Sequence, residues 1–112
     1  VKSDAFSSLV LPQTQEFLAS DVEKGFIQLS FHIKVPFPYE NAQLIVLGNV
    51  DKLGNWQPIN GLKLSNSYCN NEWSGTVSFN KFPEVLEYKY AWLHSNNQIT
   101  FETGENRHLK DI

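Results

Sequence analysis

Residues 27–35 read Ile27-Gln28-Leu29-Ser30-Phe31-His32-Ile33-Lys34-Val35. Apolar and polar side chains alternate throughout this stretch, and a period of two places the apolar ones on a single face of a β-strand. Pro36 ends the pattern because proline has no backbone N–H to donate to a neighbouring strand. The stretch therefore predicts a strand with one face in a hydrophobic core.

Further strands are predicted along the rest of the chain. They cover residues 43–47, 73–79, 86–93 and 98–102. Turn-forming residues at 94–97 predict that the last two of these strands form a hairpin. Short strands at regular spacing, without a convincing helix, are typical of an all-β domain, either a small antiparallel sandwich or an open barrel.

The register of that hairpin is predicted by placing the apolar residues of both strands on one face. The expected pairs are Leu93 with Gln98, Trp92 with Ile99, Tyr90 with Phe101, and Lys89 with Glu102. Lys89 and Glu102 would then form a cross-strand ion pair on the opposite face. Tyr88, Tyr90 and Trp92 are assigned to the core.

Residues 1–25 show no sustained period. Residues 14–19, Thr-Gln-Glu-Phe-Leu-Ala, could form one or two helical turns, which are too short to be stable alone. We expect residues 1–25 to be a linker or a loosely packed N-terminal segment. Residues 26–112 are expected to form the β-sandwich module.

Length and charge restrict the possible partners. The 112 residues suit one domain, and the net charge of -3 argues against nucleic acid or an anionic membrane as a partner. Cys69, the sole cysteine, cannot form an internal disulfide, and no Asn-x-Ser/Thr acceptor occurs, which favours an intracellular or plastid parent protein over a secreted one. The chain begins with Val1 and contains no methionine, so we expect a module of a larger enzyme.

Motifs for catalysis or metal binding are missing from the sequence. His32, His94 and His108 lie far apart, and neither the cysteine nor any carboxylate stands at a metal-ligand spacing from them. The sequence therefore predicts no cofactor and no metal, and it favours a binding module. Acids distant in sequence can converge, so a small glycan-hydrolysing enzyme is one alternative. A sandwich whose aromatic residues contact a protein partner is another.

The most unusual stretch is residues 48–56, which read Gly-Asn-Val-Asp-Lys-Leu-Gly-Asn-Trp. Trp56 follows Gly54 and Asn55, where turn chemistry rather than strand pairing sets the backbone, so its ring belongs to no alternating face. Gln57 and Pro58 give it few apolar neighbours in sequence. From this stretch alone, packing and ligand contact are equally favoured roles for the ring.

Several motifs, in their order and spacing, resemble the family 20 carbohydrate-binding module, a starch-binding domain. They are Gly48-Asn49, Leu53-Gly54-Asn55-Trp56, Trp73, Glu87-Tyr88-Lys89-Tyr90, Phe101-Glu102 and Glu105-Asn106-Arg107, and the resemblance runs from about Ile27 to the C-terminus. It implies an immunoglobulin-like β-sandwich of about seven strands. It also implies non-catalytic binding of α-1,4-glucans such as starch, glycogen, maltooligosaccharides or cyclodextrins, usually beside an attached catalytic domain. A family 48-type glycogen-binding module of a regulatory protein is a related alternative.

The resemblance also implies a first binding site. Trp56 matches the loop tryptophan that stacks on a glucose ring, whose apolar C–H face suits the negative face of an indole. Lys89, Glu102 and Asn106 match polar residues that bond sugar hydroxyls. Phe101 stands where the family usually has a second tryptophan, so the smaller ring should weaken or reshape the site. A regular pleat sends Phe101 and Glu102 to opposite faces, so both reach sugar only if the strand twists, bulges or ends there.

A second site is matched more loosely. Tyr68 lies near the family's loop tyrosine, and Tyr39 lies within a residue of another. Trp73 aligns with a tryptophan near that site, but its place at the head of an alternating strand favours core packing.

Overall fold

The computed structural model describes residues 14–21, 25–35, 41–67 and 72–110. The strands are β1 (Thr14–Asp21), β2 (Phe26–Lys34), β3 (Ala42–Gly48), β4 (Leu62–Lys63), β5 (Ser65–Ser67), β6 (Glu72–Phe79), β7 (Val85–His94), β8 (Ile99–Phe101) and β9 (Arg107–Lys110). Two short 3-10 helices, η1 (Asp51–Trp56) and η2 (Pro58–Asn60), follow β3.

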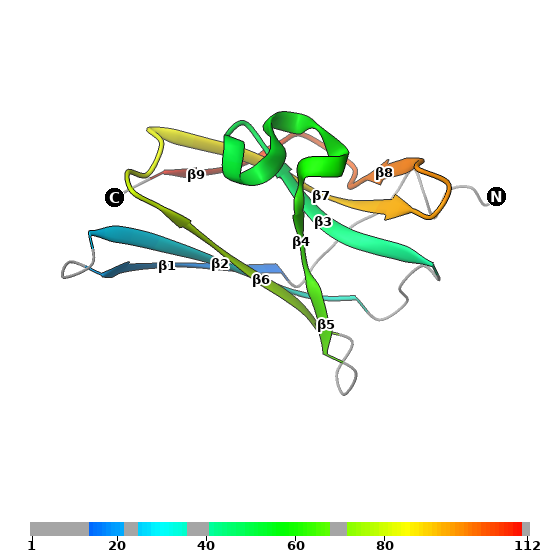
Figure 1. The fold of residues 1–112 in the computed structure, drawn as a ribbon, viewed down its shortest axis with the longest axis horizontal. Coiled ribbons are helices and arrows are strands. Elements are labelled where there is room, and N and C mark those ends of the chain that lie inside the picture. The colour runs from blue at the N-terminus through cyan, green and yellow to red at the C-terminus, as the bar shows by residue number, and fades with distance from the viewer. Residues whose placement is uncertain (1–13, 22–24, 36–40, 68–71, 111–112) are drawn as a thin grey trace.

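The strands form two antiparallel sheets that face each other (Figure 1). We call them the β2 sheet, with the order β1-β2-β6-β5, and the β3 sheet, with the order β4-β3-β7-β8 and with β9 also paired to β7. The chain passes from one sheet to the other between β4 and β5. The predicted all-β antiparallel sandwich is confirmed, with β1, β4, β5 and β9 in addition to the strands that the sequence predicted.

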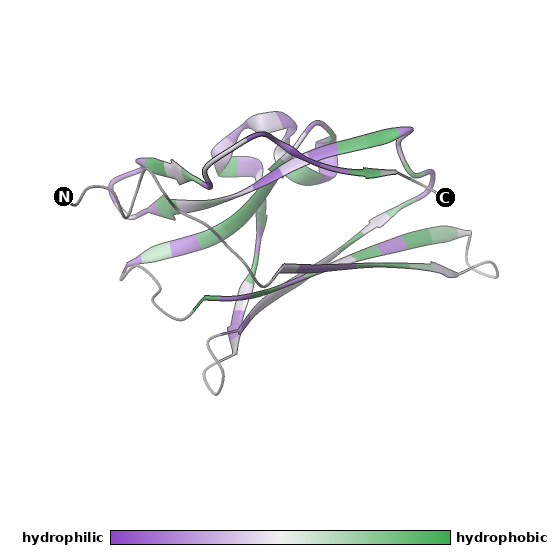
Figure 2. Ribbon diagram, turned by 180° about the vertical axis from the view of Figure 1, so that it is seen from behind, coloured by the Kyte–Doolittle hydropathy of each residue, from purple (hydrophilic) through white to green (hydrophobic). Residues whose placement is uncertain are grey.

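The core lies between the sheets and follows the predicted alternation. Along β2, Leu29, Phe31 and Ile33 are buried, whereas His32 and Lys34 are exposed. Figure 2 shows this succession of hydrophobic and hydrophilic residues along the strands. The predicted core positions of Tyr88, Tyr90 and Trp92 on β7 are also confirmed, since all three are buried.

β3 is buried on both faces. Leu44 and Val46 belong to the core between the sheets, whereas Ile45 and Leu47 form a second apolar cluster with Ala91 on the outer face of the β3 sheet. The helices η1 and η2 lie on this outer side (Figure 1). This cover explains the uninterrupted apolar run from Leu44 to Leu47, because both faces of that part of the strand are shielded from water.

The N-terminal segment differs from the expectation. All eight residues of β1 pair with β2, from Thr14 opposite Ile33 to Asp21 opposite Phe26. The helical turns expected at residues 14–19 are therefore wrong, and these residues are an edge strand of the β2 sheet. Residues 1–13 lie outside the described part of the chain.

The predicted hairpin between β7 and β8 exists, but its register is shifted by one residue. Leu93 pairs with Ile99 and Ala91 with Phe101. Strand pairing extends to His94, whose backbone N–H donates to the carbonyl of Gln98 at 2.8 Å. The turn between the strands therefore has one residue fewer than expected. Asn97 closes this three-residue turn in the left-handed region, with φ 69°, a geometry in which asparagine is tolerated.

The shift moves every side chain of β8 to the other face. Phe101 leaves the core face and lies opposite Ala91 on the outer face of the β3 sheet. Glu102 turns inward instead, with its N–H donating to the Tyr90 carbonyl at 3.0 Å. The expected Lys89–Glu102 pair is therefore wrong.

Candidate functional site

The loop that carries Trp56 is tied down by its own backbone. The N–H groups of Leu53 and Asn55 both donate to the Val50 carbonyl at 3.0 Å, and the N–H of Gln57 donates to Gly54 at 2.9 Å. The Leu53 side chain is fully buried and anchors the loop in the core. These bonds hold the loop in one conformation over the outer face of β3.

Three successive residues of this loop are left-handed. Gly54, Asn55 and Trp56 have φ values of 82°, 49° and 64°. A Cβ atom on Gly54 would lie 2.6 Å from the backbone carbon of Asn60, so only glycine allows η1 and η2 to approach this closely. A left-handed conformation is rare for a residue as bulky as tryptophan, and such conformations persist where the surroundings impose them. The loop thus fixes the direction in which the Trp56 side chain leaves the backbone.

An open pocket of about 470 Å³ lies beside that indole. Trp56, Lys89, Phe101 and Asn106 line it, and they come respectively from η1, β7, β8 and the segment between β8 and β9. The structure thus brings together four of the five residues that the sequence analysis assigned to a first binding site.

The two aromatic rings rest on an apolar floor. Trp56 is half-buried and packs against the outer cluster of Ile45, Leu47 and Ala91. Phe101 is 40% exposed and stands directly opposite Ala91. The Trp56 ring therefore packs on the sheet and is also partly exposed. Packing and ligand contact, the two roles that the sequence left open, do not exclude each other.

Hydrogen bonds between β7 and the segment from β8 to β9 hold both polar residues of the pocket. The Lys89 ammonium donates to the Gly104 carbonyl, and an ammonium group has further donors for a ligand hydroxyl. The Asn106 amide nitrogen donates to Glu87 at 3.4 Å, and its carbonyl oxygen is an additional acceptor. The pocket thus offers both donors and acceptors beside the aromatic rings.

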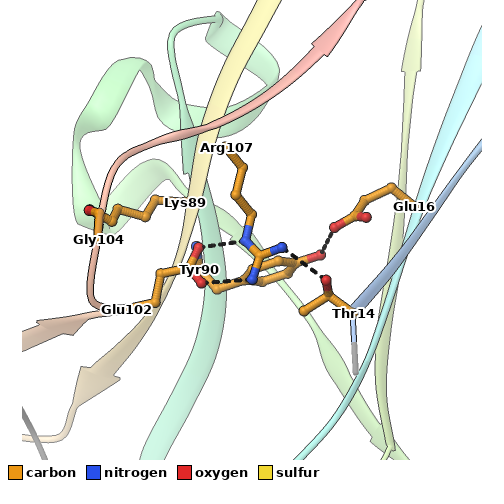
Figure 3. Close-up of polar contacts among 7 residues, drawn as sticks. All are labelled: Thr14, Glu16, Lys89, Tyr90, Glu102, Gly104 and Arg107. Carbon is orange, nitrogen blue, oxygen red and sulfur yellow. Dashed lines mark hydrogen bonds and ion pairs between the residues drawn. The ribbon is translucent and has the colours of Figure 1, made fainter. Parts of the chain in front are cut away.

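Glu102, the fifth assigned residue, does not line the pocket. Its side chain is 6% exposed, and its carboxylate accepts hydrogen bonds from the Arg107 guanidinium at 2.8 and 2.9 Å and from the Tyr90 N–H at 3.1 Å (Figure 3). The regular pleat of β8 causes this inward placement, because it sends Phe101 outward. Glu102 supports the pocket from behind rather than facing it.

Arg107 lies behind the pocket, although from the sequence it was named only within the Glu105-Asn106-Arg107 motif and had no predicted binding role. Two features of the sequence could have indicated its place beside the pocket. It is the only arginine in the sequence, and it directly follows Asn106. Its guanidinium also donates to the Thr14 hydroxyl at 2.9 Å and lies 5.2 Å from the centre of the Tyr90 ring (Figure 3). Its hydrogen bonds to Glu102 raise the pKa of Arg107 above its ordinary value.

Tyr90 completes a polar network between the two sheets. Its hydroxyl donates to the Glu16 carboxylate of β1 at 2.8 Å. Burial, followed by the negative charge of Glu16, raises the pKa of the phenol well above its ordinary value. We call Thr14, Glu16, Tyr90, Glu102 and Arg107 the inter-sheet network.

Comparison with known protein families identifies this chain. The family model described as the starch binding domain matches residues 26–111. The chain belongs to the starch-binding domain family. The resemblance to the family 20 module is thereby confirmed, and the chain is a non-catalytic carbohydrate-binding domain.

Similar proteins include larger enzymes. A glucoamylase of Neurospora crassa is 32% identical over 104 residues, which are 90% of this chain but 16% of that enzyme. The glycoside hydrolase family 15 glucoamylase of Hypocrea jecorina has a TM-score of 0.63 at 22% identity, covering 90% of this chain and 15% of that one. The family 20 module of the maltotetraose-forming amylase from Pseudomonas saccharophila STB07 has a TM-score of 0.59 at 19% identity, covering 74% of this chain and 88% of that one. The two solved structures show the shared fold.

The second site expected of a starch-binding domain lies mostly outside the described residues. Tyr39 and Tyr68 both fall there. Trp73 is described, and it is 8% exposed with its ring edge-on to Trp92, the ring centres 5.4 Å apart. The ring of Trp73 therefore packs in the core of the starch-binding domain and offers no open face for stacking.

The described part of the starch-binding domain contains neither a cluster of metal-ligating side chains nor a helix that could span a membrane. Among residues 14–21, 25–35, 41–67 and 72–110, no three His, Cys, Asp or Glu side chains gather in a group suited to a metal ion. Within the same ranges, no helix has the length and apolar character to span a membrane.

Proposed function

We propose that this starch-binding domain binds α-1,4-glucans in the pocket of Trp56, Phe101, Lys89 and Asn106. The convergence of two aromatic rings and two polar side chains in one open pocket is the observation that carries the proposal. The apolar face of a glucose ring can lie against the indole, and the hydroxyls at the ring edge can bond Lys89 and Asn106. An open pocket also accepts one part of a long polymer.

We further propose that the domain brings an attached enzyme to its polysaccharide. Three similar proteins are named as glucoamylases or as an amylase. The matched region is 16% of one glucoamylase and 15% of the other, so most of those proteins lies elsewhere. A catalytic domain in the parent chain of this module is the arrangement that these names support.

A titration with β-cyclodextrin tests the pocket. Replacing Trp56 with alanine should weaken binding by about 1–3 kcal/mol, the range measured for an aromatic residue that stacks on a flat base. Ile59→Ala is the matched control, because Ile59 is 78% exposed on η2 and does not line the pocket. Unchanged affinity in Trp56→Ala, once Tyr68→Ala in both backgrounds has removed a contribution from a second site, would sink the proposal.

The same variants should be melted. Trp56 is half-buried on the outer cluster, so its loss should destabilise the domain by less than the about 3–5 kcal/mol typical of a fully buried tryptophan. Trp92→Ala, at a fully buried position, provides that reference.

Two further assays separate the rival functions. Retarded migration in native gels that contain starch, but not in gels that contain cellulose, favours a glucan site over a protein-interaction surface. Reducing ends should not accumulate when the domain alone is incubated with soluble starch. Sustained turnover would return it to the small-enzyme alternative.

A further inference from the structure

A second hollow opens on the outer face of the β3 sheet, beyond the Trp56 pocket. It has a volume of about 420 Å³ and lies between the start of β3, β4 and the β7–β8 turn. Gln43, Lys63, Leu93, His94 and Asn97 are among its lining residues. None of these residues lines the Trp56 pocket, so the two hollows are separate features of one face.

Strand pairing places the two hollows next to each other. Phe101 of the Trp56 pocket is opposite Ala91, and Ile99 is opposite Leu93 of the second hollow. Ala91 and Leu93 are two residues apart on β7, which corresponds to about 7 Å along a strand. A ligand that leaves the Trp56 pocket along β7 therefore meets the second hollow at once.

The surface between the two hollows is apolar. Leu93 and Ile99 are half-buried and pack on the same outer cluster as Trp56, so part of each side chain still faces solvent. Trp56, Phe101, Ile99 and Leu93 thus form what we call the apolar strip. Its far end meets the polar second hollow.

The polar groups of the second hollow suit hydroxyl groups. The Lys63 ammonium donates, and the Asn97 amide both donates and accepts. Both residues are exposed at this hollow. The residues that line it, as far as the structure describes them, include no Phe, Tyr or Trp ring, so its contribution to binding comes mainly from hydrogen bonds and is weak by itself.

We propose that one glucan chain runs from the Trp56 pocket along the apolar strip and into the second hollow. The alternation of apolar ring faces and hydroxylated edges in an α-glucan matches an apolar strip that ends in a polar hollow. This extension rests on the proposed function. It assigns Lys63 and Asn97 to the binding of longer chains, while a compact ring such as β-cyclodextrin uses the Trp56 pocket alone.

The test compares maltoheptaose with β-cyclodextrin on a double variant, Lys63→Ala with Asn97→Gly. Glycine suits the second position because Asn97 has a left-handed backbone. Loss of two hydrogen bonds should weaken maltoheptaose binding about fivefold to tenfold. The affinity for β-cyclodextrin should not change, which also shows that the variant is folded.

Lys34→Ala is the matched control, since Lys34 is an exposed lysine on β2, in the other sheet. Backbone amide resonances of Lys63 and Asn97 should shift with maltoheptaose and stay in place with β-cyclodextrin. Longer oligosaccharides can gain affinity simply from having more binding registers, so the comparison between variants decides the question.

The outcomes separate the two proposals. If β-cyclodextrin does not bind the wild-type domain, the proposal that the Trp56 pocket binds glucans is wrong. If β-cyclodextrin binds through Trp56 while the double variant and the wild type bind maltoheptaose equally, the extension alone is overturned.

Discussion

Glu102 and Arg107 form a two-point ion pair directly behind the pocket, with Nε–Oε1 and Nη2–Oε2 distances of 2.8 and 2.9 Å. Glu102 follows Phe101, and Arg107 follows Asn106, so each partner is the immediate neighbour of a pocket residue. The pair therefore links the two ends of the segment between β8 and β9 to each other. This link restricts how far Phe101 and Asn106 can move apart.

The first prediction concerns this pair. Arg107→Ala leaves a buried carboxylate without its partner, which should lower the free energy of unfolding by about 3 kcal/mol, near the lower end for buried pairs. The lower end applies because the Arg107 side chain is itself 30% exposed. Urea unfolding gives the value. Arg107→Lys keeps the charge but not the planar fork, so an intermediate loss is expected. Wild-type stability in Arg107→Ala would show that the pair contributes nothing.

Phe101→Trp should strengthen glucan binding. Phe101 is 40% exposed on the outer face, so a larger ring adds stacking area without entering the core. We expect a gain of about 0.5–1.5 kcal/mol, the range for aromatic pairs, in a titration with β-cyclodextrin. Phe17→Trp is the control, because Phe17 is 53% exposed on β1. Equal or weaker binding in Phe101→Trp would mean that the ring at this position does not stack on sugar.

Alkaline pH should destabilise the domain. Burial and the charge of Glu16 raise the pKa of both Tyr88 and Tyr90 above the ordinary 10.0. The folded domain thus keeps protons that an unfolded chain releases. This contribution is fully present below the ordinary pKa and is lost as pH rises toward the folded pKa values. Urea unfolding between about pH 8 and about pH 11 should show the decline.

Tyr90→Phe is the control for the alkaline prediction. It removes one of the two phenols, so the stability should fall less steeply with rising pH than in the wild type. At neutral pH the variant should be less stable by about 1 kcal/mol, because the hydrogen bond to Glu16 is lost. Parallel pH profiles for the two proteins would count against a role for Tyr90.

The edge strand β1 should stabilise the pocket although it precedes the residues that match the family. A chain that starts at residue 26 loses the Thr14 and Glu16 partners of Arg107 and Tyr90. We expect lower thermal stability and weaker β-cyclodextrin binding at temperatures where the fragment is still folded. If residues 26–112 form the complete module, as the sequence predicted, the full chain and the shortened chain should instead melt at the same temperature. Glu16→Gln in the full chain tests the network without removing the strand.

The sequence alone determined the features that depend on near neighbours. The alternation at residues 27–35 identified a strand of the sandwich, and the Gly54-Asn55 turn identified Trp56 as a residue outside any strand face. The apolar positions of Tyr88, Tyr90 and Trp92 likewise identified core residues. Such signals are local because strand period and turn chemistry act over a few residues.

The tertiary structure alone decided which distant residues meet. A three-residue turn closed by Asn97 set the register of β8, and one residue of shift decided that Phe101 faces the pocket while Glu102 faces Arg107. β1 escaped detection because its partly buried positions Thr14 and Glu16 are polar, and their partners lie on β9 and β7. A polar side chain can be partly buried when a residue far away in the sequence, in the other sheet, binds it. The local pattern of apolar and polar residues does not reveal such a position.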